Sequence, residues 1–184
     1  MVIDAPITVE DGAAYTFGRN EKGQLGHANA STCDLYKVEI PDKVVHAATG
    51  RGHTLLVTEG GNIYSAGDNK AYQCGHTKDT TGFVKVDIKD HFVKVAAGID
   101  FSLGLSKDGK VWSWGNPQYG QLGHGSDQQY IGKGNKVIFE PQLPKLIAKF
   151  DGKRITDIQC GSNHSLALDD TGAIYVWGCA GYSI

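Results

Sequence analysis

The sequence has no long apolar run, no basic leader and no closely spaced pair of cysteines. Every apolar run is shorter than the ~18 residues that a membrane-spanning helix needs. The first residues, MVID, lack the positive charge and apolar core of a secretory signal. The four cysteines lie far apart without C-x-x-C spacing, which disfavours a zinc knuckle and a disulfide framework. We therefore expect a nuclear or cytoplasmic protein with no membrane partner.

The chain also has no excess of charge of one sign and no helical periodicity. Its 18 Lys and Arg residues stand against 20 Asp and Glu residues, for a formal net charge of −2. No overall positive field draws it to nucleic acid, so direct nucleic-acid binding is not expected. Its 25 glycines would each cost up to ~1 kcal/mol inside helices, which excludes a helical solenoid. A content of 40% hydrophobic and 21% charged residues fits one globular unit.

What the sequence does contain is one phrase that occurs three times, with glycine or leucine at the same positions of each copy. The copies are GRGHTLLVTEGGNIYSAG at 50–67, GIDFSLGLSKDGKVWSWG at 98–115 and GSNHSLALDDTGAIYVWG at 161–178. The segment after the phrase recurs as GRNEKGQLGH at 18–27, GDNKAYQCGH at 67–76 and GNPQYGQLGH at 115–124. The copies of the phrase begin 48 and then 63 residues apart, and the last interval carries about fifteen extra residues. Such repetition is typical of repeat architectures, so the chain is a series of similar units.

Each copy is predicted to consist of short strands separated by tight turns. Segments rich in β-branched and aromatic residues occupy 44–48, 53–58, 63–66 and 84–88. Gly61, Gly109 and Gly172 fall where a hairpin turn needs a positive φ, which is costly for any residue with a Cβ. Apolar residues on both faces of these strands indicate sheets covered on both sides. Four-stranded sheets that repeat in this way are the blades of a β-propeller, so we predict an all-β fold.

The repeated pattern is G-x-x-H-S/T-x-x-L, followed by glycine, aromatic-x-W-G and Y/K-G-Q-L-G-H. This pattern resembles the regulator of chromosome condensation repeat and covers nearly the whole chain. Three features indicate one particular member of that family. They are the segment GRNEKGQLGH, Phe101 in place of the usual histidine, and the segment NPQYGQLGHGSD before an insertion. The resemblance implies a seven-bladed propeller, of which this chain supplies about three to four blades. We expect one partial propeller over 1–184, with an incomplete first blade at 1–40, blades at 44–88 and 92–150, an insertion at 125–143 and an incomplete last blade at 155–184.

These blades are too few to close a seven-bladed ring. A bare terminal blade exposes apolar faces and unpaired strand edges, which natural proteins usually cover. We therefore expect a fragment or half-propeller that is completed by a second chain or by self-association.

Candidate catalytic and metal-binding residues are few. His27, His76 and His124 recur at one repeat position and could together hold a metal, but we favour a role for each in the turn of its own blade. The histidine of the G-x-x-H motif is replaced by Phe101 in the middle copy, which indicates packing. No Walker loop, nucleophile elbow or H-E-x-x-H motif is present. We predict no enzyme active site, no metal site and no cofactor.

Recognition is expected on the face of the blades where the loops before and after the repeated phrase lie together. Loops carried by a rigid scaffold commonly hold binding residues. The candidate partner-binding residues are Arg51, Asp68, Asn69, Lys70, Asp100, Asn116, Gln118, Tyr119 and Asn163, with Lys133 and Lys136 from the insertion. The insertion is expected to emerge on this face as the one irregular feature of the regular scaffold, with lysines that contact an acidic partner or face solvent.

Three functions fit this description. The first is a protein-interaction scaffold that binds a small GTPase of the Ran, Rac or Ral class, a chromatin-associated protein or a cytoskeletal regulator, as the resemblance implies. The second is a guanine-nucleotide exchange factor, the activity of the family's founding member on Ran. That activity depends on a wedge-like hairpin directly after an aromatic-x-W-G-like segment, and this chain continues through Asn116 to Gly120 without one. The third is a structural subunit that completes a larger assembly.

Overall fold

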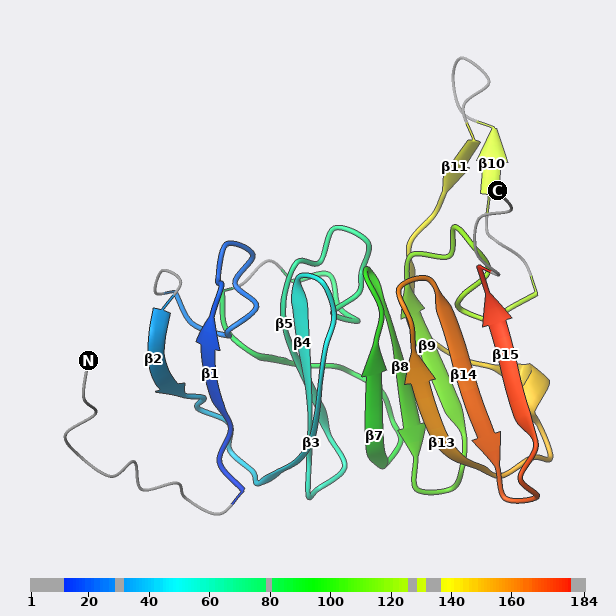
Figure 1. Cartoon of the computed structure of the whole chain (residues 1–184), viewed down its shortest axis with the longest axis horizontal. Helices are drawn as coiled ribbons and strands as arrows, with labels where there is room; N and C mark the ends of the chain where they lie inside the picture. The colour runs from blue at the N-terminus through cyan, green and yellow to red at the C-terminus, as the bar shows by residue number, and fades with distance from the viewer. Residues whose placement is uncertain (1–11, 29–31, 79–80, 126–128, 132–136, 180–184) are drawn as a thin grey trace.

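The chain folds into a row of antiparallel β-sheets that stand side by side, from β1 and β2 at one end to β15 at the other (Figure 1). The computed structural model describes residues 12–28, 32–78, 81–125, 129–131 and 137–179. Within each four-stranded sheet the strands follow one another in chain order, which is the meander of a propeller blade. The predicted all-β partial propeller is therefore confirmed.

Four sheets form the row. The first contains β1 (Tyr15–Gly18) and β2 (Thr32–Lys37); the second contains β3 (Val44–Thr49), β4 (His53–Thr58), β5 (Ile63–Gly67) and β6 (Val84–Lys85). The third contains β7 (Phe92–Ala97), β8 (Phe101–Ser106), β9 (Val111–Gly115) and β12 (Gln142–Leu146). The fourth contains β13 (Ile155–Cys160), β14 (His164–Asp169) and β15 (Ile174–Gly178), and a short 3-10 helix, η1 (Ala148–Phe150), precedes it.

The repeated glycines set the hairpin turns between the second and third strands of each sheet. Gly61, Gly109 and Gly172 have φ angles of 77°, 82° and 87°, as the turn positions require. At these turns the chain passes from β4 to β5, from β8 to β9 and from β14 to β15. The prediction of positive φ at these glycines is confirmed.

Neighbouring sheets bury the second strand of the second and third sheets from both sides. Every residue of β4 and of β8 is buried, which explains why these strands lack a clear polar face. Between the second and third sheets, Leu55 and Val57 pack in one cluster with Phe92 and Trp114. A corresponding cluster between the third and fourth sheets contains Leu103, Leu105, Ile155 and Ile158. The cores of this protein therefore lie between blades.

Tryptophan indoles fasten the third and fourth blades to the loop of the blade before each of them. Trp114 Nε1 donates a hydrogen bond to the carbonyl oxygen of Gln73 at 2.9 Å. One blade later, Trp177 Nε1 donates to the carbonyl oxygen of Gln121 at 2.8 Å. Both carbonyl oxygens accept a second bond, from Ser102 Oγ and from Ser165 Oγ respectively, each at 2.8 Å. The recurring bond fixes the distance between adjacent blades.

The inner strands β3, β7 and β13 also lie beside one another along the row. Lys94 of β7 forms an ion pair with Asp157 of β13, and His46 of β3 accepts a hydrogen bond from the backbone N–H of Val95 at 3.4 Å. Burial and the neighbouring Lys94 lower the pKa of His46. These three polar side chains share one repeat position and join three blades at their inner edge.

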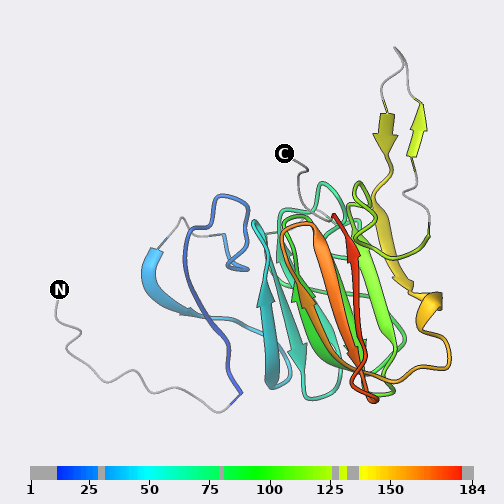
Figure 2. The ribbon, with the colours of Figure 1, turned by 45° about the vertical axis from the view of Figure 1, so that its right-hand side comes forward.

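The insertion, expected as the one feature that departs from the regular scaffold, contains a β-hairpin. β10 (Gln129–Ile131) pairs with β11 (Val137–Phe139), and the hairpin projects beyond the end of the third sheet (Figures 1 and 2). The sequence signal is a β-branched and aromatic run on each side of the glycine-containing segment GKGN. Lys133 and Lys136 lie outside the described residues.

One face of the fourth sheet is uncovered among the described residues. Ile63 of β5 and Val111 of β9 are 2% and 0% exposed, whereas Ile174, at the same repeat position in β15, is 68% exposed. Val176 is 65% exposed on the same strand. No helix within the described residues is long and apolar enough to cross a membrane.

Candidate functional site

The loops that carry most of the predicted recognition residues do meet at one end of the blades. The backbone N–H of Asp68 donates to the carbonyl oxygen of Gly52 at 2.7 Å. In the next blade, the N–H of Asn116 donates to the carbonyl oxygen of Asp100 at 3.0 Å. The N–H of Cys179 makes the same bond to Asn163 at 2.9 Å. The predicted clustering of these loops on one face is therefore confirmed.

A groove of about 420 Å³ crosses this loop face over the first three blades. It brings together Arg51, Asp68, Lys70 and Asp100 of the predicted set, and we call it the loop-face groove. Its remaining lining residues are Arg19, Glu21, Lys22, Gln24, Gly52, Ala71, Gln73 and Ile99. The groove therefore joins residues from three separate repeats into one surface.

Charges of both signs line the loop-face groove. Arg19 and Glu21 form an exposed ion pair at 2.5 Å, which partly neutralises the first-blade side of the groove. Arg51 and Lys70 are exposed on the second blade. Such a surface suits a partner that presents both acidic and basic side chains, because each charge then finds a complement.

Asp100 is the most constrained of these acidic residues. Its Oδ2 accepts a hydrogen bond from Asn116 Nδ2 at 2.7 Å, while its Oδ1 is buried and has no hydrogen-bond partner within the described residues. A buried carboxylate oxygen without a donor costs stability, so it favours any group that supplies one. The carboxylate of Asp100 is therefore a hydrogen-bond acceptor on the third-blade side of the groove.

Other predicted site residues have structural roles or lie apart from the groove. Asn69 Oδ1 accepts the backbone N–H of Cys74 at 2.9 Å and its Nδ2 donates to the carbonyl oxygen of His76, so it holds its own loop together. Asn20 makes the equivalent bonds in the first blade. Gln118, Tyr119 and Asn163 are not among the residues that line the groove.

Sequence reasoning missed the contribution of the first blade to the groove. Arg19, Glu21 and Lys22 belong to the segment GRNEKGQLGH, and that segment aligns with GDNKAYQCGH in the second blade. Arg19 thus occupies the repeat position of Asp68, and Glu21 that of Lys70. Applying the repeat alignment to every copy was the signal that could have identified them.

Each recurring histidine serves its own blade, as predicted. The ring of His27 stacks near Tyr36 with ring centroids 4.1 Å apart, and His76 Nδ1 lies 3.4 Å from Asn69 Nδ2. His124 Nε2 lies 2.9 Å from Ser113 Oγ. Burial, aided by nearby Lys145, lowers the pKa of His124 to about 4. Among the described residues, no three His, Cys, Asp or Glu side chains gather to hold a metal ion.

Buried histidine and cysteine side chains are held in their uncharged forms. His53 Nε2 lies 2.9 Å from Ser102 Oγ, whose proton goes to the carbonyl oxygen of Gln73, so the imidazole donates and is the Nε2–H tautomer. Burial lowers the pKa of His53 to about 4. Burial also raises the pKa of the Cys74 thiol to about 12 and raises that of Cys160. The raised pKa values disfavour the thiolate that nucleophilic cysteine chemistry needs, so Cys74 and Cys160 are packed parts of the scaffold, as is the buried ring of His53.

The blade architecture and the loop motifs can now be compared with known proteins. The model of the regulator of chromosome condensation (RCC1) repeat matches residues 11–57 and 108–168, and a second model of the same repeat matches 44–73, 92–121 and 155–183. The chain belongs to the RCC1 repeat family. The family resemblance seen in the sequence is therefore confirmed.

Within the family, the chain is similar to Protein RCC2 homolog of Xenopus laevis. The two are 39% identical over 197 residues, which cover 96% of this chain and 38% of that protein. The particular member that the sequence indicated is RCC2, and this similarity confirms the resemblance. The chain spans well under half of that relative's length. It is an RCC1-like repeat protein homologous to RCC2, which supports a regulatory or interaction role.

Solved structures of yeast RCC1 (Prp20) show the same fold. The complex of Kap60 with Prp20 superimposes with a TM-score of 0.76 at 26% identity, over 91% of this chain and 40% of that one. A structure of Prp20p from Saccharomyces cerevisiae, described together with its binding properties to Gsp1p and histones, gives 0.69 at 27% identity over 92% and 40%.

Proposed function

We propose that this chain is a protein-interaction scaffold whose loop-face groove binds a small GTPase of the Ran, Rac or Ral class or a chromatin-associated protein. The observation that carries the proposal is the groove itself, where Arg51 and Asp100 come from loops 49 residues apart in sequence and line one surface. Support also comes from yeast Prp20p, which is described with binding to Gsp1p and histones. The partner acts at the loops, while the blades serve as a rigid frame.

The chemistry of the groove favours a protein partner over a small molecule. Charged side chains of both signs line it, whereas small-molecule sites are mostly apolar with a few convergent polar groups. Cationic Arg51 and Lys70 are exposed and would contact acidic side chains at the edge of an interface. Contacts of this type change the association rate and its salt dependence more than the final affinity.

Charge reversal on the groove tests the proposal. The double variant Arg51→Glu and Lys70→Glu is mixed with immobilised Ran, Rac and Ral GTPases in both nucleotide states, and with histone octamers. We expect at least ~10-fold weaker binding of the true partner, with a low-salt association rate that falls further. Lys110→Glu, an exposed change in the turn at the opposite end of the third blade, is the matched control. Unchanged binding by the groove variant would place recognition elsewhere.

A guanine-nucleotide exchange factor is the second candidate, and the β10–β11 hairpin favours it. The hairpin projects beyond the end of the blades, where it could reach into a bound partner (Figure 2). Release of fluorescent GDP from each GTPase separates the two candidates, since a scaffold binds without accelerating release. Replacing residues 129–139 by a short Gly-Ser linker would abolish release if the hairpin acts as a wedge.

We further propose a nuclear or cytoplasmic location, in keeping with small GTPase and chromatin partners. The cysteines among the described residues are all free, which suits a reducing compartment. Imaging of a fluorescent fusion tests this directly, and retention in the secretory pathway would contradict it.

A further inference from the structure

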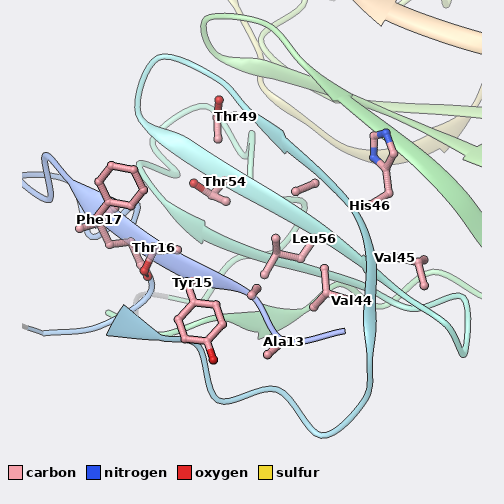
Figure 3. A pocket seen from close by; sticks show the side chains of 13 residues that line it. Ala13, Tyr15, Thr16, Phe17, Val44, Val45, His46, Thr49, Thr54 and Leu56 are labelled. Atoms are coloured by element: carbon pink, nitrogen blue, oxygen red, sulfur yellow. The ribbon is translucent and has the colours of Figure 1, made fainter. Parts of the chain in front are cut away.

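Two cavities lie between the first and second blades, and they differ in charge. The larger, of about 460 Å³, lies between β1 and the strands β3 and β4, where Tyr15, Phe17, Val44 and Leu56 are among its lining side chains (Figure 3). None of the described residues that line it is Lys, Arg, Asp or Glu. The second cavity, of about 390 Å³, borders the loop-face groove and is lined by three lysines. We call this second cavity the Tyr72 pocket.

Lysines of both blades surround the Tyr72 pocket. Lys22 comes from the first blade, whereas Lys70 and Lys78 come from the second, and all three are exposed. Asp68 is the one acidic residue among the described lining residues. Burial lowers the pKa of His76, so its ring is uncharged at pH 7. The lining therefore carries three positive charges against one negative charge, which favours an anion.

The packing of the first blade against the second brings Lys22 to this pocket. A Cβ on Gly52 would lie 3.6 Å from Lys22 Cγ and 3.4 Å from Asp68 Cβ, so both side chains flank the same glycine of the second blade. Lys22, Asp68 and Lys70 also line the loop-face groove. An anion in the Tyr72 pocket therefore lies beside any partner that occupies the groove.

Tyr72 has a backbone conformation that a bulky side chain disfavours. Its φ is 57°, and it is the only non-glycine residue with a positive φ among the described residues. Gly23 and Gly120 occupy the same repeat position, with φ angles of 73° and 74°. The N–H of Tyr72 donates to the carbonyl oxygen of Asn69 at 3.1 Å, and Gly23 forms the equivalent bond at 3.1 Å. The turn is thus unchanged, and the tyrosine adds strain of the kind that clusters at binding sites.

A second departure from the repeat lines the same pocket. Cys74 stands where the first and third blades have Leu25 and Leu122. The N–H of Cys74 still bonds to the asparagine side chain of its loop at 2.9 Å, as that of Leu25 does at 2.9 Å. The two departures therefore change the wall of one cavity and leave the loop itself intact. Positions that break an otherwise consistent pattern are expected at functional sites.

We propose that the Tyr72 pocket binds a phosphate group, carried by a phosphorylated serine or threonine of the protein that occupies the loop-face groove. Such a group has a charge of about −1.5 to −2 at pH 7 and three acceptor oxygens, so it complements three ammonium groups better than a carboxylate does. Lysine binds phosphate as a point charge, and the Tyr72 phenol adds a hydroxyl to the lining. The inference rests on the proposed function only for the protein that carries the phosphate.

Nuclear magnetic resonance titration of the isotope-labelled full chain tests the pocket directly. The probes are a short peptide with a central phosphoserine, the same peptide with glutamate in its place, and inorganic phosphate. We expect saturable shifts of the Tyr72 and Cys74 amide signals, with the phosphoserine peptide binding at least ~5-fold more tightly than the glutamate peptide. Equal affinities of the two peptides would overturn the proposal. Tighter binding of inorganic phosphate than of the phosphoserine peptide would overturn the protein source and assign the pocket to free phosphate.

Two variants show whether the shifts come from this pocket. Lys78 lines the pocket and not the groove, so Lys78→Gln should weaken phosphoserine-peptide binding at least ~3-fold and leave the urea midpoint unchanged. Tyr72→Gly restores the residue of the other two blades, so the turn should stay folded while the affinity falls. Lys110→Gln, at the opposite end of the third blade, is the matched control and should bind like the wild type. Wild-type affinity in both pocket variants would overturn the proposal.

The phosphate proposal and the proposed function fail in different measurements. Arg51 lines the groove and not the pocket, so Arg51→Glu should weaken binding of the GTPase or histone partner and change phosphoserine-peptide affinity less than Lys78→Gln does. Full partner binding by the Arg51 variant would contradict the proposed function alone. A wild-type Tyr72 signal that does not shift with the phosphoserine peptide would overturn the phosphate proposal alone.

Discussion

Replacing Trp114 tests the statement that blade-to-blade contacts hold this protein together. The side chain is 0% exposed and packs with Leu55, Val57 and Phe92 between the second and third sheets. Its indole N–H donates to the carbonyl oxygen of Gln73 at 2.9 Å. Trp114→Ala removes both contributions and leaves a large cavity, so we expect a loss of about 3–5 kcal/mol in the free energy of unfolding.

Two further variants divide that loss into its parts. Trp114→Phe keeps most of the apolar contact and removes the donor, and Gln73 keeps its bond from Ser102, so the expected cost is about 1–2 kcal/mol. Trp177 makes the same bond to Gln121 but is only partly buried, since among the described residues no strand lies beside β15 as β12 lies beside β9. Trp177→Ala should therefore cost clearly less than Trp114→Ala.

Urea unfolding followed by far-ultraviolet circular dichroism measures these differences without relying on tryptophan fluorescence. The midpoints should rank wild type, Trp114→Phe, Trp177→Ala and Trp114→Ala in order of decreasing stability. If Trp177→Ala proves as destabilising as Trp114→Ala, burial between two blades is not the source of the stabilisation, and the reasoning fails.

Three further predictions concern the contacts around His53. Burial lowers the pKa of His53 to about 4, below the ordinary 6.5. Between those two pH values the unfolded chain binds a proton that the folded chain does not. The free energy of unfolding should therefore fall by up to ~3 kcal/mol as the pH drops from 6.5 to 4. His53→Phe, the residue type found at Phe101, should reduce the difference between urea midpoints at pH 7 and pH 4.5, and an unchanged difference would refute this. Ser102→Ala should cost about 1–2 kcal/mol in urea unfolding at pH 7, since the imidazole loses its acceptor; no loss would contradict the bond. Gly67→Ala should lower the melting temperature far more than Gly23→Ala, although both glycines have positive φ. A Cβ on Gly67 would lie 2.3 Å from the carbonyl oxygen of Gly52, whereas the nearest backbone atoms to a Cβ on Gly23 are 3.9 Å away. Similar shifts would show that φ strain alone matters.

Much of the fold was predictable because the repeat presents the same local signals several times. Gly61 and its equivalents define hairpin turns through backbone sterics, which act within a few residues. The strands around them are short and rich in β-branched residues, so their positions differ from the prediction by only a residue or so at most ends. The β6 strand is the exception: of the expected segment at 84–88, only Val84–Lys85 forms a strand. Val86 still donates its N–H to the carbonyl oxygen of Ile63 at 2.9 Å, and the chain then turns, with the N–H of Ile88 bonded to the carbonyl oxygen of Val86.

The candidate site was predictable only in part. Arg51, Asp68, Lys70 and Asp100 were found because loops at equal repeat positions must emerge on one face. The repeat alignment gives Arg19 the position of Asp68, but its place in the same groove follows only from the packing of the first blade against the second. Asn69 was predicted as a binding residue, but its amide is used within its own loop, and only the three-dimensional arrangement of that loop reveals this.

The sequence by itself determined that this protein is a row of β-propeller blades of the RCC1 type, because glycine sterics and strand propensity are local and are repeated along the chain. The tertiary structure decided how the blades engage. The bond from Trp114 to Gln73 joins residues 41 positions apart, and the loop-face groove combines three repeats. Such contacts depend on the distance and angle between sheets, which no single repeat encodes.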